Sequence, residues 1–254
     1  MALNLIFLGA PGAGKGTVAE EIVSKFGLTQ ISTGDLVRAE VKSGSKLGKQ
    51  IEDIAKRGEL VSDEIIARML ETKLKEVVKS AEFRGVIFDG FPRNLKQAEM
   101  FESILKRNKQ PLSAVINIDA SEQTIVSRLS SRRTCPHCKK VYNLKTNPPK
   151  KEGICNNDGN KLYQRTDDTP KAIKNRFRIF LKETTPLVKH YTKLGLLHGY
   201  NGNVPIRESA IAAKKIIARI VKAKTIAAKQ IAKKLPKRVG TTTQKAKALR
   251  VRRR

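Results

Sequence analysis

The chain has 254 residues and a formal net charge of +29, with 52 lysines and arginines against 23 acidic residues. This length suits one large domain or a domain that carries insertions. No run of about 18 apolar residues occurs, so the sequence predicts no membrane-spanning helix. No basic-then-apolar leader precedes the first apolar run, and we therefore expect a cytoplasmic protein.

The N-terminal segment combines an apolar run, a glycine-rich turn and the start of a helical pattern. Residues 3–8 predict a buried strand, and residues 9–17 read GAPGAGKGT. Glycines let the backbone approach an anion closely, and the following helix presents its positive N-terminal end. Lys15 adds a mobile charge that can reach terminal phosphates. General P-loops have Ser or Thr after the lysine, whereas this chain has Gly16 and then Thr17. The pattern predicts a phosphate-binding loop.

Further short apolar runs predict a parallel sheet. They lie at residues 28–31, 86–88, 114–118 and 196–200. The stretches between them have helical spacing, which indicates an α/β fold of the P-loop type, with a parallel five-stranded sheet flanked by helices. Thr169 and Pro170 form an N-cap and first-turn proline, and they predict a helix running to about Thr184.

Two regions interrupt this alternation. Residues 32–61 are helical and polar with no strand, and residues 131–168 are rich in Cys, Pro, Asn, Lys and Gly. We interpret both as insertions in a core formed by residues 1–31, 62–130 and 169–223.

Asp89 ends an apolar run at residues 86–88. A carboxylate there lies at the carboxyl edge of a parallel sheet, beside the P-loop, where ligands bind. Such a group can hold magnesium directly or through water. The alternative is a structural carboxylate that caps a neighbouring turn.

The three cysteines lie in the second insertion. Cys135 and Cys138 belong to the sequence CPHC, and Cys155 follows after a gap of 16 residues. An odd cysteine count in a cytosolic chain argues against a disulfide framework and for metal binding or catalysis. The spacing fits a tetrahedral zinc site with Asp158 as the fourth ligand, and four protein ligands make such a zinc structural. His137 is a competing ligand with poor geometry, and three cysteines without metal are the other alternative.

At four motifs, in the same order, the chain resembles the adenylate kinase family over about residues 1–222. The motifs are GAPGAGKGT with its Gly16, STGDLVR at residues 32–38, FDGFPR at residues 88–93 with Gln97, and Arg132 with RTDD at residues 165–168 and Arg176. The resemblance implies a P-loop kinase with an AMP-binding insertion at 32–61 and a zinc-held lid at 131–168. It implies the magnesium-dependent reaction ATP + AMP ⇌ 2 ADP. Residues 224–254 lie outside it.

The resemblance also implies roles for individual residues. The ATP phosphates would be bound by Gly12, Ala13, Gly14, Lys15, Gly16, Thr17 and Arg132, and the ATP base would contact Val141, Tyr142 and the backbone near Val204. AMP would be bound by Thr33, Arg38, Gly90, Phe91, Pro92, Arg93, Gln97, Arg165 and Arg176, with the backbone of Glu59, Leu60 and Val61 along the adenine. The catalytic group would be Lys15, Asp89, Arg93, Arg132, Arg165 and Arg176. The implied cofactors are Mg²⁺ with ATP and structural Zn²⁺ on Cys135, Cys138, Cys155 and Asp158.

Phosphoryl transfer suits this residue set, because its catalysis depends on positioning and charge stabilisation. Three alternatives stay open at this point: a UMP/CMP kinase, a GTP-dependent AMP kinase, and a nucleic-acid-binding protein on a kinase scaffold. We expect the chain to act as a monomer.

The C-terminal end concentrates positive charge. Residues 214–254 hold 16 lysines and arginines and no acidic residue. Residues 224–254 predict a basic tail that is helical at first and disordered over 237–254. The charge indicates an arm that binds polyanions such as nucleic acid without sequence preference, or a solvated tail with no partner.

Overall fold

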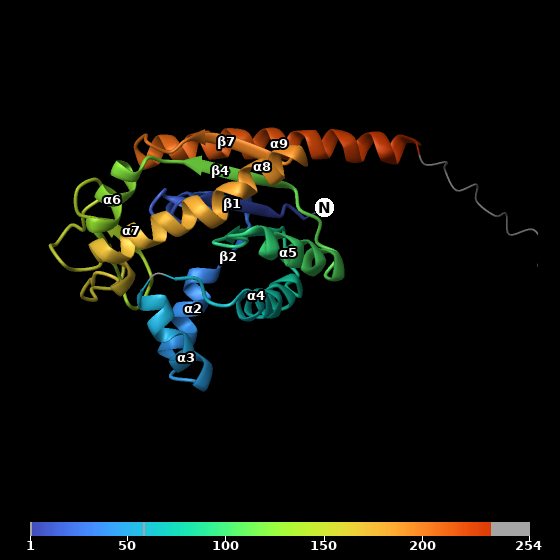
Figure 1. The fold of residues 1–254 in the computed structure, drawn as a ribbon. Coiled ribbons are helices and arrows are strands. Elements are labelled where there is room, and N and C mark those ends of the chain that lie inside the picture. Colours follow the sequence, from blue (N-terminus) through green and yellow to red (C-terminus); the bar gives the residue numbers. More distant parts are fainter. Residues whose placement is uncertain (1, 58, 235–254) are drawn as a thin grey trace, which may run out of the picture.

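The computed structural model describes residues 2–57 and 59–234 (Figure 1). Five parallel strands form its central sheet in the order β2-β3-β1-β4-β7. Their bounds are β1 Leu5–Gly9, β2 Thr29–Ser32, β3 Val86–Asp89, β4 Ala114–Asp119 and β7 Leu197–Asn201. The predicted α/β fold with a five-stranded parallel sheet flanked by helices is confirmed.

Helices cover both faces of the sheet. The helices of one face are α4 Asp63–Val78, α5 Leu95–Arg107 and α8 Thr185–Lys193, and those of the other are α1 Lys15–Phe26 and α9 Ile206–Lys234. Along β1, Ile6 and Leu8 pack into the first layer, whereas Leu5 and Phe7 pack into the second. The central strands β3, β1 and β4 are largely buried on both sides, and their sequences are therefore mostly apolar, whereas the edge strands β2 and β7 are more polar and more exposed.

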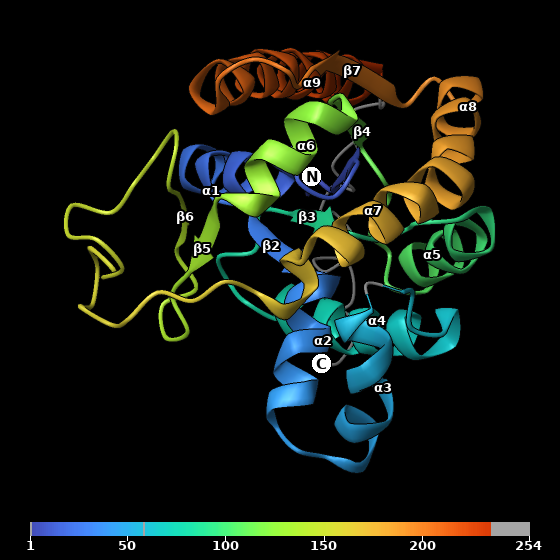
Figure 2. The same cartoon turned by 60° about the vertical axis from the view of Figure 1, so that its left-hand side comes forward.

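Two groups of elements extend from this core at the carboxyl ends of the strands. The helices α2 Thr33–Lys42 and α3 Lys46–Lys56 lie together at the bottom of Figure 2. The segment that we call the lid, residues 131–168, follows α6 Glu122–Ser130 and extends to the left in Figure 2. It contains the antiparallel pair β5 Arg132–Thr134 and β6 Val141–Asn143, and it ends in the short helix η1 Thr166–Asp168.

The helix predicted from Pro170 begins as expected, because the Thr169 side chain accepts the Ala172 N–H. Its predicted end near Thr184 is wrong. Helix α7 Pro170–Ile179 continues through the wider π-helical turn η2 Phe180–Thr184 into α8. Pro186 has no N–H and its ring obstructs a regular α-turn, so a wider turn carries the chain past it.

Helix α9 crosses the top of the molecule and continues beyond the sheet (Figure 1). Ala213 and Ile217 are buried in the apolar layer that it shares with α1. The predicted disorder of residues 237–254 lies outside the described residues. None of the helices within the described ranges is long and apolar enough to cross a bilayer.

Candidate active site

The loop between β1 and α1 is built around glycine. Gly9 has φ +143°, and a Cβ there would lie 2.5 Å from the carbonyl oxygen of Ile118, so only glycine fits. The Lys15 ammonium folds back over this loop and donates to the carbonyl oxygens of Gly9 at 2.8 Å and Ala10 at 3.0 Å. The lysine charge is therefore held at the start of α1, where the helix dipole already favours an anion.

Asp89 lies at the carboxyl end of β3, opposite Phe7 of β1. Its Oδ2 accepts a hydrogen bond of 3.2 Å from the Gln30 side chain. A Cβ on Gly16 would lie 3.8 Å from the same Oδ2, so the carboxylate faces the first turn of α1. One carboxylate beside a phosphate loop suits Mg²⁺, which keeps several waters and is shared with substrate phosphates.

In the segment after Asp89, the Gly90 carbonyl oxygen accepts two side-chain hydrogen bonds. The Gly90 carbonyl oxygen accepts from Thr33 Oγ1 at 2.9 Å and from Arg93 Nε at 2.7 Å. Gln97 accepts from the Arg93 backbone N–H at 2.7 Å and donates to Asp63 Oδ1 at 2.7 Å. Thr33 and Gln97 are buried. Both side chains fix the Arg93 segment in place.

The other residues that the resemblance implies for AMP binding are partly engaged in ion pairs and partly buried. Arg38 pairs with the Asp35 carboxylate at 2.6 Å, and Glu59 pairs with its neighbour Arg57 at 3.0 Å. Val61 is buried and Leu60 is half-buried. Phe91 packs edge-on against Phe101 in the core, next to a cis peptide bond to Pro92.

Three arginines meet two aspartates at the base of the lid. Asp168 is fully buried and accepts from Arg132 Nε at 2.6 Å and Nη2 at 2.5 Å. Arg176 Nη1 lies 3.2 Å from Asp168 Oδ1 and 3.0 Å from Asp167 Oδ2. Arg165 Nε is 3.5 Å from Asp167 Oδ1, and this buried nitrogen has no hydrogen-bond partner among the described residues. Cations thus outnumber carboxylates here.

The pKa values of these buried cations are lowered by burial and by the charges of their neighbours. Burial lowers the pKa of Lys15 to about 8, Asp89 opposes that shift, and Arg93 and Arg176 add to it. Burial, with the charge of Arg176, also lowers the pKa of Arg93 to about 10. The pKa of Arg165 falls to about 10, mainly through burial. Partly desolvated cations that repel one another form a site for a multiply charged anion.

The lid cysteines come together with Asp158. The ligand atoms of Cys135, Cys138, Cys155 and Asp158 all lie within 4.8 Å of one another. Cys138 Sγ is 3.5 Å from Cys155 Sγ, and Cys135 Sγ is 3.3 Å from Asp158 Oδ2. A tetrahedral zinc with bonds of about 2.3 Å to sulfur has edges of about 3.6–3.8 Å, so the cluster fits such an ion. These residues can hold a metal ion.

Comparison with known proteins decides the family. Residues 7–196 match the family model described as adenylate kinase. The chain belongs to the adenylate kinase family. A relative named adenylate kinase from Kosmotoga olearia is 43% identical over 204 residues, covering 80% of this chain and 94% of that protein. Those from Archaeoglobus fulgidus and Staphylococcus aureus are 42% and 41% identical, covering 80% and 81% of this chain and 93% and 94% of theirs.

One residue that the sequence analysis missed lies at the P-loop of this family member. Arg128 of α6 donates to the carbonyl oxygens of Ala13 at 3.1 Å and Val204 at 2.8 Å. It joins the loop after β1 to the loop after β7. Both contacts of Arg128 are with residues distant in the sequence, so local patterns do not predict them. The one sequence feature that points to Arg128 is its position four residues before Arg132.

Of the two lid residues implied for the ATP base, Tyr142 has its side chain inside the lid. Its ring is buried with the cysteines, and its hydroxyl lies 3.4 Å from Cys155 Sγ and accepts the Asn156 N–H at 2.8 Å. Val141 is half-buried and pairs with Thr134 between the two lid strands. The Tyr142 side chain therefore packs against the cysteine cluster, and only the backbone of Tyr142 is free to contact the ATP base.

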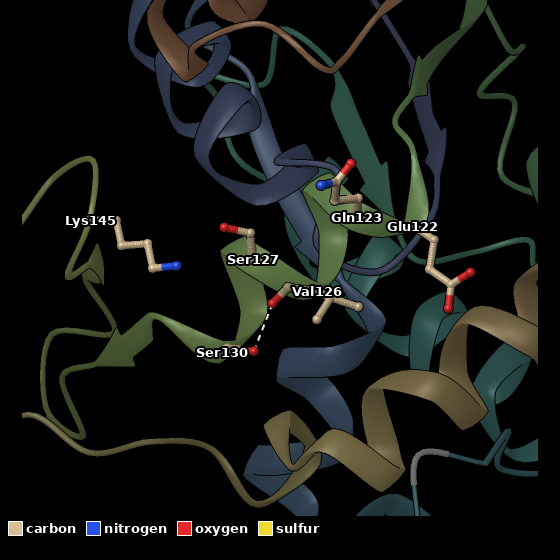
Figure 3. Close-up of a pocket in the computed structure, with 6 residues that line it drawn as sticks. All are labelled: Glu122, Gln123, Val126, Ser127, Ser130 and Lys145. Atoms are coloured by element: carbon tan, nitrogen blue, oxygen red, sulfur yellow. Dashed lines mark hydrogen bonds between the residues drawn. The ribbon is translucent and has the colours of Figure 1, made fainter.

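One hollow lies away from these residues, beside α6. Its volume is about 700 Å³. Figure 3 shows its lining residues on α6 and, across from the helix, Lys145 of the lid. It is lined by Glu122, Gln123, Val126, Ser127, Ser130 and Lys145. A second hollow of about 540 Å³ lies beside Glu59 and α7. Lys15, Asp89 and Arg93 line neither of these two hollows.

Proposed function

We propose that this chain catalyses reversible transfer of the γ-phosphoryl group of ATP to AMP, giving two molecules of ADP, with Mg²⁺ accompanying ATP. The observation that carries the proposal is the convergence of Lys15 and Arg93 with the lid-base arginines: the charges of Arg93, Arg176 and Arg132 lower the pKa of Lys15, and that of Arg176 lowers the pKa of Arg93. Phosphoryl transfer needs such an array, because negative charge spreads over the equatorial oxygens of the group in flight. Membership of the adenylate kinase family supports the same reaction.

On the donor side, the ATP phosphates bind the backbone N–H groups from Gly12 to Thr17. Lys15 exchanges its two carbonyl partners for phosphate oxygens, which are charged acceptors and therefore stronger ones. Arg132 contacts the same phosphates. The adenine lies along the backbone of Val141, Tyr142 and Val204.

On the acceptor side, AMP lies between α2 and the segment after β3. Arg38 and Arg93 bind its phosphate, and Thr33, Gln97 and the backbone of Glu59, Leu60, Val61, Gly90, Phe91 and Pro92 enclose the rest. Because Thr33 and Gln97 are already bonded to protein atoms, they hold the Arg93 segment in shape as well as contacting the nucleotide.

In the reaction an oxygen of the AMP phosphate attacks the γ-phosphorus of ATP while the bond to the β-phosphate oxygen breaks. Arg132, Arg165 and Arg176 stabilise the charge that develops, and their guanidinium groups stay protonated throughout. Lys15 neutralises the departing β-phosphate. Asp89 would hold Mg²⁺, directly or through water, and the ion would supply further charge neutralisation on the phosphates.

In the lid, Cys135, Cys138, Cys155 and Asp158 hold a structural Zn²⁺. The lid's own apolar cluster consists of Cys135, Tyr142, Cys155 and Leu162. So small a core gives little folding free energy, and metal binding supplies it instead.

The test is an initial-rate assay of the purified chain with paired nucleotides. ATP is offered with AMP, UMP or CMP, and GTP is offered with AMP, each with Mg²⁺ and with excess EDTA. We expect ATP with AMP to be the fastest pair and EDTA to abolish turnover. Faster turnover with UMP or CMP would replace the proposed acceptor. Size-exclusion chromatography of the active protein tests the monomer, which we expect because all these residues come from one chain.

A further inference from the structure

Helix α9 has one face attached to the core. Ala213 and Ile217 are fully buried against the sheet layer. Lys214 pairs with Glu21 of α1 at 2.7 Å, and Lys224 donates to Ser113 Oγ at 2.5 Å. These contacts fix the rotation of the helix about its own axis, so the direction of its opposite face is also fixed.

That opposite face carries a row of cations. Lys215, Arg219, Lys222 and Lys229 are exposed and follow the spacing i, i+4, i+7 and i+14. At about 100° per residue, this spacing places all four within an arc of about 80°, and the first and last are about 21 Å apart along the axis. We call these four residues the basic row.

No acidic neighbour neutralises the basic row. Within residues 2–57 and 59–234, none of its four side chains forms an ion pair with a carboxylate. In the sequence, Glu208 is the last acidic residue before the C-terminus. Four aligned charges without counter-charges create a strong local potential that attracts a polyanion.

We propose that the basic row is a docking surface for the phosphate backbone of a nucleic-acid duplex. Duplex DNA carries one negative charge per about 1.7 Å of axis, so a row about 21 Å long faces many phosphates. The chain has no aromatic residue after Tyr200, which removes the stacking platforms that single strands use. Binding therefore depends on charge and is independent of base sequence.

The exposed apolar residues of α9 argue against a lipid surface. They are Ile211, Val221 and Ile226. Val221 lies about 120° around the helix from Lys215. Ile211 and Ile226 both lie on the side of the row, but they are about 22 Å apart along the axis with the cations between them, so these side chains form no continuous apolar face. Interfacial helices need a wide apolar face opposite their cations, and here that opposite face is buried in the protein.

The surface is separate from the kinase site. Residues 197–254 lie outside the matched family model, which ends at residue 196. None of the four residues is among those proposed to touch a nucleotide. The proposal therefore does not depend on the proposed reaction, and docking would leave phosphoryl transfer running.

The experiment compares three full-length proteins by fluorescence anisotropy with a labelled 20-base-pair DNA duplex over a salt series. The first is the unmodified chain. The second is the row variant Lys215→Gln/Arg219→Gln/Lys222→Gln/Lys229→Gln. The third, with the same loss of charge, replaces four other exposed lysines that form no ion pair among the described residues: Lys25→Gln/Lys79→Gln/Lys106→Gln/Lys193→Gln. ADP formation is measured for each as a control for folding.

Each lost phosphate contact makes the plot of log K against log salt shallower by about 0.9. We expect the slope of the row variant to be shallower by up to about 3.6, with weaker binding at low salt, while the control variant stays close to the unmodified chain. All three should keep the same turnover. Equal duplex affinity and slope in the two variants would overturn the proposal.

Two further ligands distinguish the partner. A 20-base-pair RNA duplex should show the same dependence on the basic row, because the phosphate backbone is shared. Vesicles of phosphatidylserine and phosphatidylcholine should bind more weakly than either duplex at equal ionic strength. Row-dependent binding to vesicles without binding to either duplex would make the surface a membrane contact and overturn the proposal.

Discussion

Arg132 and Asp168 join the two ends of the lid through a two-bond ion pair. Arg132 is the first residue of β5 and Asp168 is the last of η1, and their atoms meet at 2.6 Å and 2.5 Å. The aspartate is fully buried, so the arginine is its main source of compensation, together with Arg176. The pair fixes where the lid leaves the core and where the Arg132 charge lies.

We therefore expect Asp168→Asn to impair both stability and turnover. Breaking a buried ion pair by removing one partner costs about 3–5 kcal/mol, and two arginines lose their orientation. Glu76→Gln is the control, because Glu76 pairs with Lys73 at the surface, where such pairs contribute about 0–1 kcal/mol. Urea unfolding measures the loss of stability in both variants. A loss in Asp168→Asn no larger than in the control would contradict this account of the lid base.

Lys15→Ala and Arg93→Ala should each reduce kcat by about 10²–10³ while circular dichroism stays unchanged. Removing one preorganised charged donor from a transition state costs about 3–4 kcal/mol. Arg68→Ala, on the exposed side of α4, removes an arginine that forms no ion pair among the described residues and should keep normal turnover. A folded Arg93→Ala protein with near-normal kcat would remove Arg93 from the catalytic group.

The depressed pKa of Lys15 predicts a pH dependence of ATP capture. The pKa of this lysine in the free protein is about 8, so its charge is present below that pH and is lost above it. We expect kcat/KM for ATP to fall as pH rises through about 8, because this parameter reports the free enzyme. The falling limb should move to higher pH in Lys15→Arg. A flat profile up to pH 10 would contradict the assignment.

The lowered pKa of Lys15 also makes the folded protein more stable as the pH rises, whereas ATP capture weakens over the same range. Between about pH 8 and the ordinary lysine value of 10.5, the unfolded chain binds a proton that the folded chain lacks. Stability rises with pH wherever the unfolded state binds more protons. Lys15→Gln should remove this contribution, and thermal melts of both proteins between pH 8 and 10 measure it.

Metal analysis separates the candidate lid ligands. The protein purified without chelator should contain one zinc per chain, which Cys135→Ser/Cys138→Ser should lose. His137 Nδ1 lies 3.1 Å from Asp158 Oδ2, so the histidine hydrogen-bonds to a proposed ligand and its side chain is exposed. His137→Ala should therefore keep the metal, whereas Asp158→Ala should bind it far more weakly. The opposite result would make His137 the fourth ligand.

Removing the metal should lower Tm without preventing ATP binding. The P-loop lies in the core, and its glycine geometry does not depend on the lid. Nucleotide binding by the zinc-free protein is measured by fluorescence titration. Complete loss of ATP binding in a zinc-free protein whose core stays folded would contradict the prediction that the P-loop binds ATP independently of the lid metal.

The strands and the P-loop could be predicted from the sequence because local patterns determine them. Residues 114–118 are mostly apolar and largely buried, as expected for a strand covered by helices on both faces. The positive φ of Gly9, Gly12 and Gly14 likewise follows from residue type. The sequence also indicated that Cys135, Cys138, Cys155 and Asp158 could form a metal cluster, and the structure brings them together.

Contacts between distant residues could not be predicted in this way. Arg128 reaches Val204, 76 residues away, and nothing near either residue indicates the partner. The burial of Tyr142 depends on how the lid folds around Cys155. The continuation past Thr184 depends on a π-helical turn that tolerates Pro186, whereas a local rule ends the helix there.

The most direct test of the account follows the γ-phosphoryl group itself. The purified chain is incubated with Mg²⁺, AMP and ATP labelled with ³²P at the γ-position, and the products are separated by chromatography. We expect the label to appear in the β-position of ADP, with little inorganic phosphate, and Arg93→Ala to slow its appearance by at least about 10². Label released as inorganic phosphate at a rate independent of AMP would contradict phosphoryl transfer between nucleotides.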